Sequence, residues 1–98
     1  MHVLTVCYGH PADPAAFDAY YTSTHAPLAG KIPGMASFTH RHCESLDGSQ
    51  PPYFLIAELG FASADAFEAA MATPEGHAAG ADVPNFASGG VTMFIAYD

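Results

Sequence analysis

Two nearly continuous apolar runs constrain the fold of this chain most. Residues 53–61 (YFLIAELGF) and 91–97 (VTMFIAY) are rich in aliphatic and aromatic side chains, and each has the length of a strand. Successive side chains of a strand point to opposite sides of the sheet, so such runs need cover on both faces. We therefore expect a sheet with helices on one face and a second subunit on the other.

The remaining elements follow from caps, turns and shorter apolar runs. Further strands are expected over residues 3–8 and 35–44. Helices are expected to begin at Asp13-Pro14, at Ser63 and, as a short extra turn to about residue 79, at Thr73-Pro74, with a loop over residues 82–86. The order β-α-β-β-α-β predicts an α+β fold of the ferredoxin-like, split βαβ type, with a four-stranded antiparallel sheet and both helices on one face.

The size and composition of the chain indicate one domain that associates with itself. A length of 98 residues fits a single domain over residues 1–98. Half of the residues are hydrophobic and only 12% are charged, which is a thin polar coat for a small monomer. Two such sheets facing each other in a homodimer would form a dimeric α+β barrel with an apolar lumen, and we expect the functional site in that lumen.

The charge balance excludes several classes of partner. The formal net charge is −8, and the only cations are Lys31 and Arg41. Two basic residues cannot neutralise a run of phosphates, so neither nucleic acid nor an anionic membrane is an expected partner. The first residues, Met1 to Val6, show neither a signal-peptide pattern nor a membrane span, and we expect a cytoplasmic protein.

The segment of residues 17–28 holds the main catalytic candidates. Tyr20, Tyr21 and His25 follow one another at the end of an expected helix, which Pro27 is expected to break. A histidine there could act as a general acid or base near neutral pH, with Tyr21 assisting it. Alternatively, His25 could cap the helix by bonding a free backbone carbonyl.

Other residues could complete a small-molecule site. Tyr8 and Tyr20 could orient a substrate oxygen, or could be core aromatics with their hydroxyl groups at the rim. Asp82 and Asn85 could form a hydrogen-bonding pair at the mouth of a pocket, or only stabilise a turn. His40 is a further candidate for substrate binding.

The segment His40-Arg41-His42 raises the question of a metal site. Strand alternation would place His40 and His42 on the face that Glu44 also shares, as in sites built from two histidines and a carboxylate. A solvated edge strand produces the same pattern, and we adopt that interpretation. Since the chain also lacks GxGxxG, P-loop, GxSxG and HExxH motifs, we expect no metal and no other cofactor.

Several stretches together resemble the EthD-domain proteins, small dimeric α+β barrels named after a component of bacterial ether-degradation clusters. The most specific is Tyr20-Tyr21 followed by His25-Ala26-Pro27-Leu28. The others are Tyr8-Gly9, Phe17-Asp18-Ala19, Ile32-Pro33-Gly34, Phe54 to Leu59 with Phe61, Pro74-Glu75-Gly76, Asp82 to Phe86 and Gly89-Gly90-Val91. The resemblance implies a homodimeric barrel and site roles for Tyr21 and His25. It implies site roles for Asp82 and Asn85 less directly.

Activity is less constrained, since relatives include dehydratases of polyketide pathways and other barrels of this type perform varied chemistry. The first interpretation is a cofactor-independent lyase, isomerase or cyclase that acts on a small hydrophobic carbonyl or aromatic metabolite through His25 and Tyr21. The second is a binding or accessory protein of a degradation or biosynthetic pathway. The third is a haem-dependent or oxygen-dependent enzyme.

Overall fold

The structure is a computed structural model that describes all 98 residues. Its strands are β1 (His2–Tyr8), β2 (Ser37–His42), β3 (Leu55–Phe61) and β4 (Val91–Tyr97). Its helical segments are α1 (Pro14–Tyr20), a π-helical turn (Tyr21–His25), α2 (Ala26–Ala29), α3 (Ala64–Met71), α4 (Pro74–Asp82) and a 3₁₀ turn (Val83–Asn85). No helix is both long enough and apolar enough to cross a membrane.

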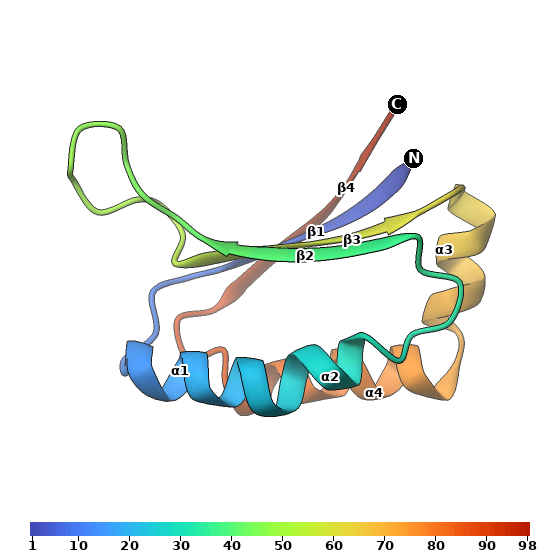
Figure 1. Ribbon diagram of the computed structural model, residues 1–98, viewed down its shortest axis with the longest axis horizontal. Coiled ribbons are helices and arrows are strands. Elements are labelled where there is room, and N and C mark those ends of the chain that lie inside the picture. The colour runs from blue at the N-terminus through green and yellow to red at the C-terminus, as the bar shows by residue number, and fades with distance from the viewer.

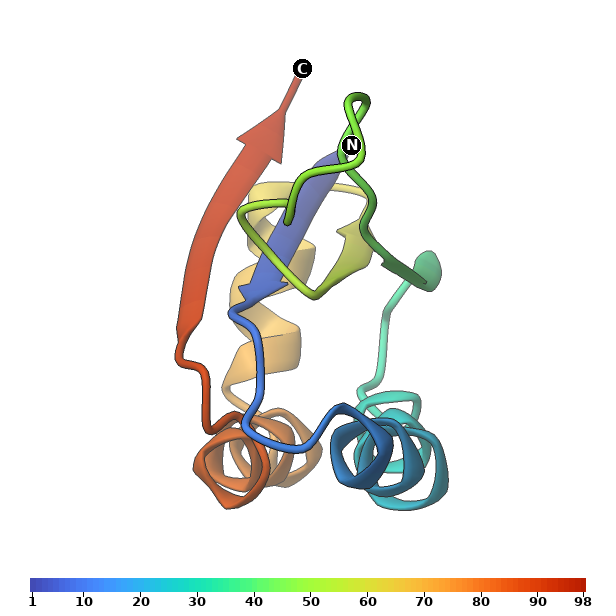
Figure 2. The same cartoon turned by 90° about the vertical axis from the view of Figure 1, so that its left-hand side faces the viewer.

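The strands form one antiparallel sheet in the order β2-β3-β1-β4. All the helices lie on the same side of this sheet, with α1, α2 and α4 beneath it and α3 at one end (Figures 1 and 2). The predicted α+β class, the ferredoxin-like topology and the one-sided cover of the sheet are confirmed. The largely apolar strands β3 and β1 lie in the centre of the sheet, and β2 and β4 are its edges.

The helix starts follow the cap signals of the sequence. Asp13, Ser63 and Thr73 each accept a hydrogen bond at the side chain from the backbone N–H group three residues later. Pro14 and Pro74 each occupy the first helical position, where a missing N–H group has no cost. The predicted starts are therefore correct.

Several predicted ends are wrong. The second strand covers Ser37–His42 and not residues 35–44, and the third covers Leu55–Phe61 and not residues 53–61. Helix α4 does not stop near residue 79 but reaches Asp82, and a 3₁₀ turn replaces most of the expected loop. Asp82 is thus held by a helix and is not part of a loose connection.

Pro27 does not break the first helical run, which continues to Ala29. The π-helical turn at Tyr21–His25 precedes the proline, and the N–H group of Ala26 bonds the carbonyl of Tyr21. This wider turn lets the chain continue where proline lacks a donor and crowds the preceding turn. His25 therefore lies inside a helical run and not, as expected from the sequence, at a helix C-terminus.

The core lies between the sheet and the helices. Strand alternation turns Val6 and Tyr8 of β1, and the odd-numbered residues of β3, towards the helices, and all of these are buried. Tyr8, Leu55 and Phe61 are the most completely enclosed large side chains. The opposite face of the sheet carries no helix (Figure 2), and Phe94 on that face is 50% exposed.

Candidate functional site

A buried histidine–aspartate pair forms the centre of the candidate site. The Nδ1 atom of His25, on the π-helical turn, lies 2.9 Å from Oδ2 of Asp82 at the end of α4. His25 is 5% exposed and Asp82 is 8% exposed, so little water competes for this contact. The side chain of His25 therefore does not cap its own helix.

Asp82 is held in its ionised form by several donors. Burial alone would raise its pKa, but hydrogen bonds from Tyr20, His25 and Asn85 outweigh that effect and lower the pKa of the carboxyl below its usual value. The Tyr20 hydroxyl donates to Oδ1 at 2.6 Å, and the Asn85 amide donates to the same oxygen at 3.0 Å. Because an ionised carboxylate only accepts, Nδ1 of His25 carries the proton.

Protonation at Nδ1 leaves the lone pair of a neutral imidazole on Nε2. The Tyr8 hydroxyl lies 3.5 Å from Nε2, which is too long for a strong hydrogen bond. Burial, followed by the nearby Tyr21 and Asp82, raises the pKa of Tyr8, so it remains a neutral phenol. Nε2 thus faces a weak proton donor and remains free to take a proton from a ligand.

A small apolar cavity adjoins this pair. Its volume is about 120 Å³, and it lies between the sheet and the helices. His25 and Tyr21 are its only titratable lining residues; the others are Leu4, Val6, Ala29, Ile32, Phe38, Ala57, Leu59, Met71, Ala79, Gly80, Val83 and Met93. Burial raises the pKa of Tyr21 to about 12, so its hydroxyl is a proton donor at neutral pH.

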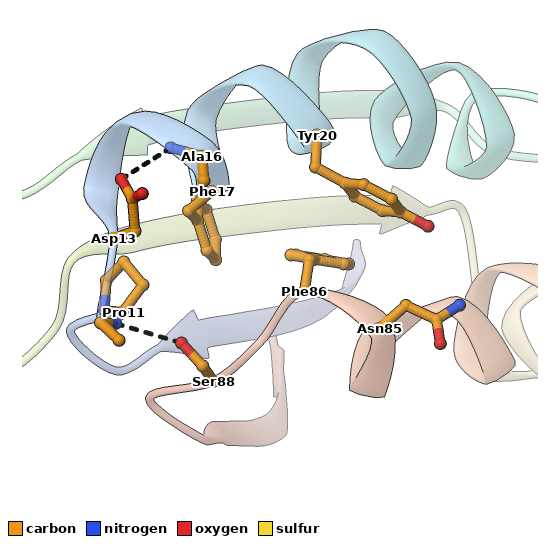
Figure 3. Close-up of a pocket in the computed structure, with 9 residues that line it drawn as sticks. Pro11, Asp13, Ala16, Phe17, Tyr20, Asn85, Phe86 and Ser88 are labelled. Carbon is orange, nitrogen blue, oxygen red and sulfur yellow. Dashed lines mark hydrogen bonds between the residues drawn. The ribbon is translucent and has the colours of Figure 1, made fainter.

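A separate, open cleft of about 280 Å³, here called the outer cleft, lies between α1 and the segment around Phe86 (Figure 3). Tyr20 and Asn85 line it, together with Asp13, Phe86 and Ser88. Tyr20 therefore does not share the cavity with His25, although it was predicted to bind substrate there. Its ring stacks on Phe86 with the ring centroids 5.4 Å apart, and its hydroxyl reaches Asp82.

The other predicted site residues lie further out. His40 is exposed on β2, with its ring centroid 5.0 Å from that of Tyr21 and 5.8 Å from that of Phe38, so it lies beside two residues that line the cavity. His42 is exposed and bonds Asp18 at 2.8 Å. Glu44 lies beyond the end of β2, and no three His, Cys, Asp or Glu side chains converge as metal ligands would.

The position of the site within the fold corrects one expectation. The expected place was a lumen between two sheets, whereas Tyr8, Tyr21 and His25 are buried between the sheet and the helices of one chain. The reason is strand alternation, which turns Tyr8 towards the helices with Val6. The uncovered face carries Glu58, which is exposed and lies 3.9 Å from Arg41.

Two relationships in the site were not expected from the sequence. Asp82 was expected to pair with Asn85, as it does, but not to contact His25, which is 57 positions away. Phe86 was not a candidate, yet its ring centroid lies 4.6 Å from that of His25. The one signal in the sequence for both residues was that Asp82 and Phe86 belong to the same block of the EthD resemblance, residues 82–86.

Sequence comparisons identify relatives of this chain. The sequence-family model of the EthD domain matches residues 9–90 of this chain. An uncharacterized 11.0 kDa protein in the thcB-thcC intergenic region of Rhodococcus erythropolis is 52% identical over 95 residues, which cover 97% of this chain and 92% of that protein.

Solved structures extend the likeness to the whole fold. An ethyl tert-butyl ether d (ethd) family protein from Bacillus halodurans is 33% identical, with a TM-score of 0.93 over 100% of this chain and 98% of that one. A dimeric ferredoxin-like protein of unknown function from Jannaschia sp. is 16% identical, with a TM-score of 0.70 and full cover of both chains. On the strength of the domain match and the two relatives above 30% identity, this chain belongs to the EthD domain family.

Proposed function

We propose that this protein is an acid–base enzyme of the lyase, isomerase or cyclase type that acts on a small hydrophobic carbonyl or aromatic compound. The observation that supports this most is the buried His25–Asp82 pair beside an apolar cavity. A positioned base of this kind contributes typically ~10²–10⁴-fold to a rate. Proton transfer needs neither a metal nor an organic cofactor.

In the proposed reaction, Nε2 of His25 takes a proton from a carbon next to a carbonyl group. The electron pair of the broken C–H bond forms a C=C bond, and the π electron pair of the carbonyl moves to its oxygen. A tyrosine hydroxyl donates a hydrogen bond to that oxygen. Tyr21 is the better placed donor because it lines the cavity, and Tyr8 is the second. The imidazolium pairs with the Asp82 carboxylate until it returns the proton to another atom of the substrate.

The cavity limits the class of substrate. Its lining contains no lysine or arginine, and Asp82 contributes a negative charge nearby. A carboxylate or phosphate would enter without a counter-ion, which is strongly unfavourable in a buried site. A neutral compound with one or two polar atoms and about the size of a single ring fits best.

We also propose that the protein works as a homodimer through the uncovered face of the sheet. That face carries Phe94, which is 50% exposed, and the apolar Ile56. Two structural neighbours, from Jannaschia sp. and Bacteroides fragilis, are described as dimeric. Sedimentation at micromolar concentration tests this, and a monomer would contradict it.

Proton abstraction can be tested without the natural substrate. Cyclohexanone and acetophenone in D₂O serve as probes, and NMR follows the exchange of protons next to the carbonyl. We expect exchange with the native protein and none above background with His25→Gln. His77→Gln, which changes an exposed histidine of α4, is the matched control and keeps the exchange.

The same probes separate catalysis from binding. A probe that raises the melting temperature of the native protein but never exchanges its protons indicates the binding or accessory role. Full exchange in His25→Gln would remove His25 from the mechanism.

A further inference from the structure

The Tyr20 hydroxyl and the Asn85 amide converge on one oxygen of the Asp82 carboxylate. Tyr20 donates to Oδ1 at 2.6 Å and Asn85 donates to Oδ1 at 3.0 Å, whereas His25 uses Oδ2 at 2.9 Å. The two oxygens thus have separate partners. An unsupported carboxylate would turn about its terminal bond and present either oxygen, or neither, to the imidazole.

The two donors are themselves held by the fold. The ring of Tyr20 stacks on Phe86 at an interplanar angle of 24°, which fixes the direction of its hydroxyl. Asn85 ends the 3₁₀ turn that follows α4, only three residues from Asp82. Figure 3 shows Tyr20 reaching from α1 towards the segment that carries Asn85 and Phe86.

We propose that Tyr20 and Asn85 are positioning residues that fix the proton of His25 on Nδ1 by holding the Asp82 carboxylate in one orientation. The hydrogen-bond partners of the two ring nitrogens decide which nitrogen of a neutral histidine carries the proton. With Oδ1 occupied by two donors, Oδ2 accepts from Nδ1, and Nε2 stays free for substrate. The inference rests on the proposed role of His25 as a base.

A positioning role fits the chemistry of Asp82 better than a proton relay through Tyr20. A relay would require the carboxylate to take up a proton, yet the donors that surround Asp82 stabilise its charged form. Tyr20 also faces the outer cleft and not the cavity, so it reaches the reacting atoms only through Asp82. The structure thus assigns it a role different from substrate binding.

Nitrogen NMR of protein labelled in its histidine rings tests the proposal directly. His25→Gln identifies the His25 signals among those of the six histidines. In the native protein we expect the neutral imidazole to carry its proton on Nδ1 and none on Nε2. Tyr20→Phe and Asn85→Ala should each lower the ratio of the Nδ1–H to the Nε2–H form, by about tenfold in the double variant, since hydrogen bonds to a charged group are strong.

The controls keep the result interpretable. Tyr97→Phe removes a hydroxyl from a tyrosine that is 74% exposed, and it should leave the His25 signals unchanged. Tyr20→Phe should lower kcat for proton exchange more than it raises KM, because Tyr20 does not line the cavity.

Two results would overturn the inference. One is a native His25 protonated on Nε2. The other is an unchanged ratio in a folded Tyr20→Phe, Asn85→Ala double variant. Neither result decides the proposed function, which depends on the loss of exchange in His25→Gln. Conversely, the native protein and its variants could show the expected ratios of the two His25 forms while the native protein catalyses no exchange. The proposed function would then be wrong, and the positioning role of Tyr20 and Asn85 would still be supported.

Discussion

The Nδ1 atom of His25 lies 2.9 Å from Oδ2 of Asp82 across a separation of 57 residues. One residue comes from the π-helical turn of the first helical run and the other from the end of α4. The contact forms only when α2 and α4 pack together beneath the sheet. The formation of this buried pair therefore depends on the tertiary structure as much as on the local sequence.

Replacing Asp82 with asparagine should impair both stability and activity. The amide keeps the shape but brings an NH₂ group among the three donors Tyr20, His25 and Asn85, one of which loses its acceptor. We expect the free energy of unfolding to fall by about 1–3 kcal/mol. Proton exchange should fall by ~10²–10⁴-fold.

Urea denaturation and the exchange of cyclohexanone protons measure these effects. Glu44→Gln, which neutralises an exposed carboxylate outside the strands, is the charge-matched control and should change neither. An Asp82→Asn variant with native stability would mean that the carboxylate does not hold these donors together.

The lowered pKa of Asp82 predicts how stability depends on pH. The folded-state pKa lies below the usual value of 3.8, so the carboxylate stabilises the protein above that value. This contribution is lost as the pH falls through the folded pKa. The difference in the free energy of unfolding between the native protein and Asp82→Asn should shrink as the pH falls below the usual carboxyl pKa of 3.8.

Urea denaturation at a series of pH values between neutral and strongly acidic tests this prediction. A difference that stays constant down to the lowest pH would show that Asp82 is not preferentially ionised in the folded state.

The regular part of the fold could be predicted from the sequence because its signals are local. Asp13, Ser63 and Thr73 are caps that act on residues three positions away, and the apolar run at 91–97 became β4 with the expected bounds. The behaviour of Pro27 could not be predicted in the same way. Its effect depends on whether the preceding turn widens, as the π-helical turn at Tyr21–His25 does here, and no local signal in the sequence marks that widening.

The site was only partly predictable for a similar reason. Tyr21 and His25 are close in sequence, so their proximity followed from helical spacing. The contact of His25 with Asp82 joins distant segments, and no spacing rule connects them. The face of β1 that carries Tyr8 towards His25 depends on strand register, since a shift by one residue would turn it to the opposite side.

Filling the cavity should abolish ligand binding without unfolding the protein. Ala57 lines the cavity on β3 and is 2% exposed, so Ala57→Leu places three additional carbon atoms in the space of about 120 Å³. We expect the free energy of unfolding to change by less than about 3 kcal/mol. The rise in melting temperature with cyclohexanone should disappear.

Thermal denaturation with and without cyclohexanone measures this effect. Ala69→Leu, at an exposed position of α3, adds the same atoms elsewhere and should keep the ligand effect. A ligand effect that survives in Ala57→Leu would place the binding site outside this cavity, with the outer cleft as the next candidate.

Two glycines of α4 should respond in opposite directions to substitution by alanine. A Cβ atom on Gly80 would meet nothing within 4 Å, whereas one on Gly76 would lie 2.5 Å from the carbonyl oxygen of Ala70 and 2.9 Å from Cα of Met71. Gly80→Ala should raise the free energy of unfolding by about 0.5–1 kcal/mol, because alanine favours the helix. Gly76→Ala should lower it by about 1–3 kcal/mol through overpacking against the end of α3.

Urea denaturation of the two variants measures the contrast directly, and each variant is the control for the other because both change glycine to alanine in one helix. Equal stabilisation by both substitutions would mean that the start of α4 does not press against α3. Gly76 lies near the start of α4, where the backbone closely approaches α3, and the other end of the same helix carries Asp82, the partner of His25. A loosened start of α4 should therefore also weaken proton exchange, although Gly76 itself is far along the helix from the site.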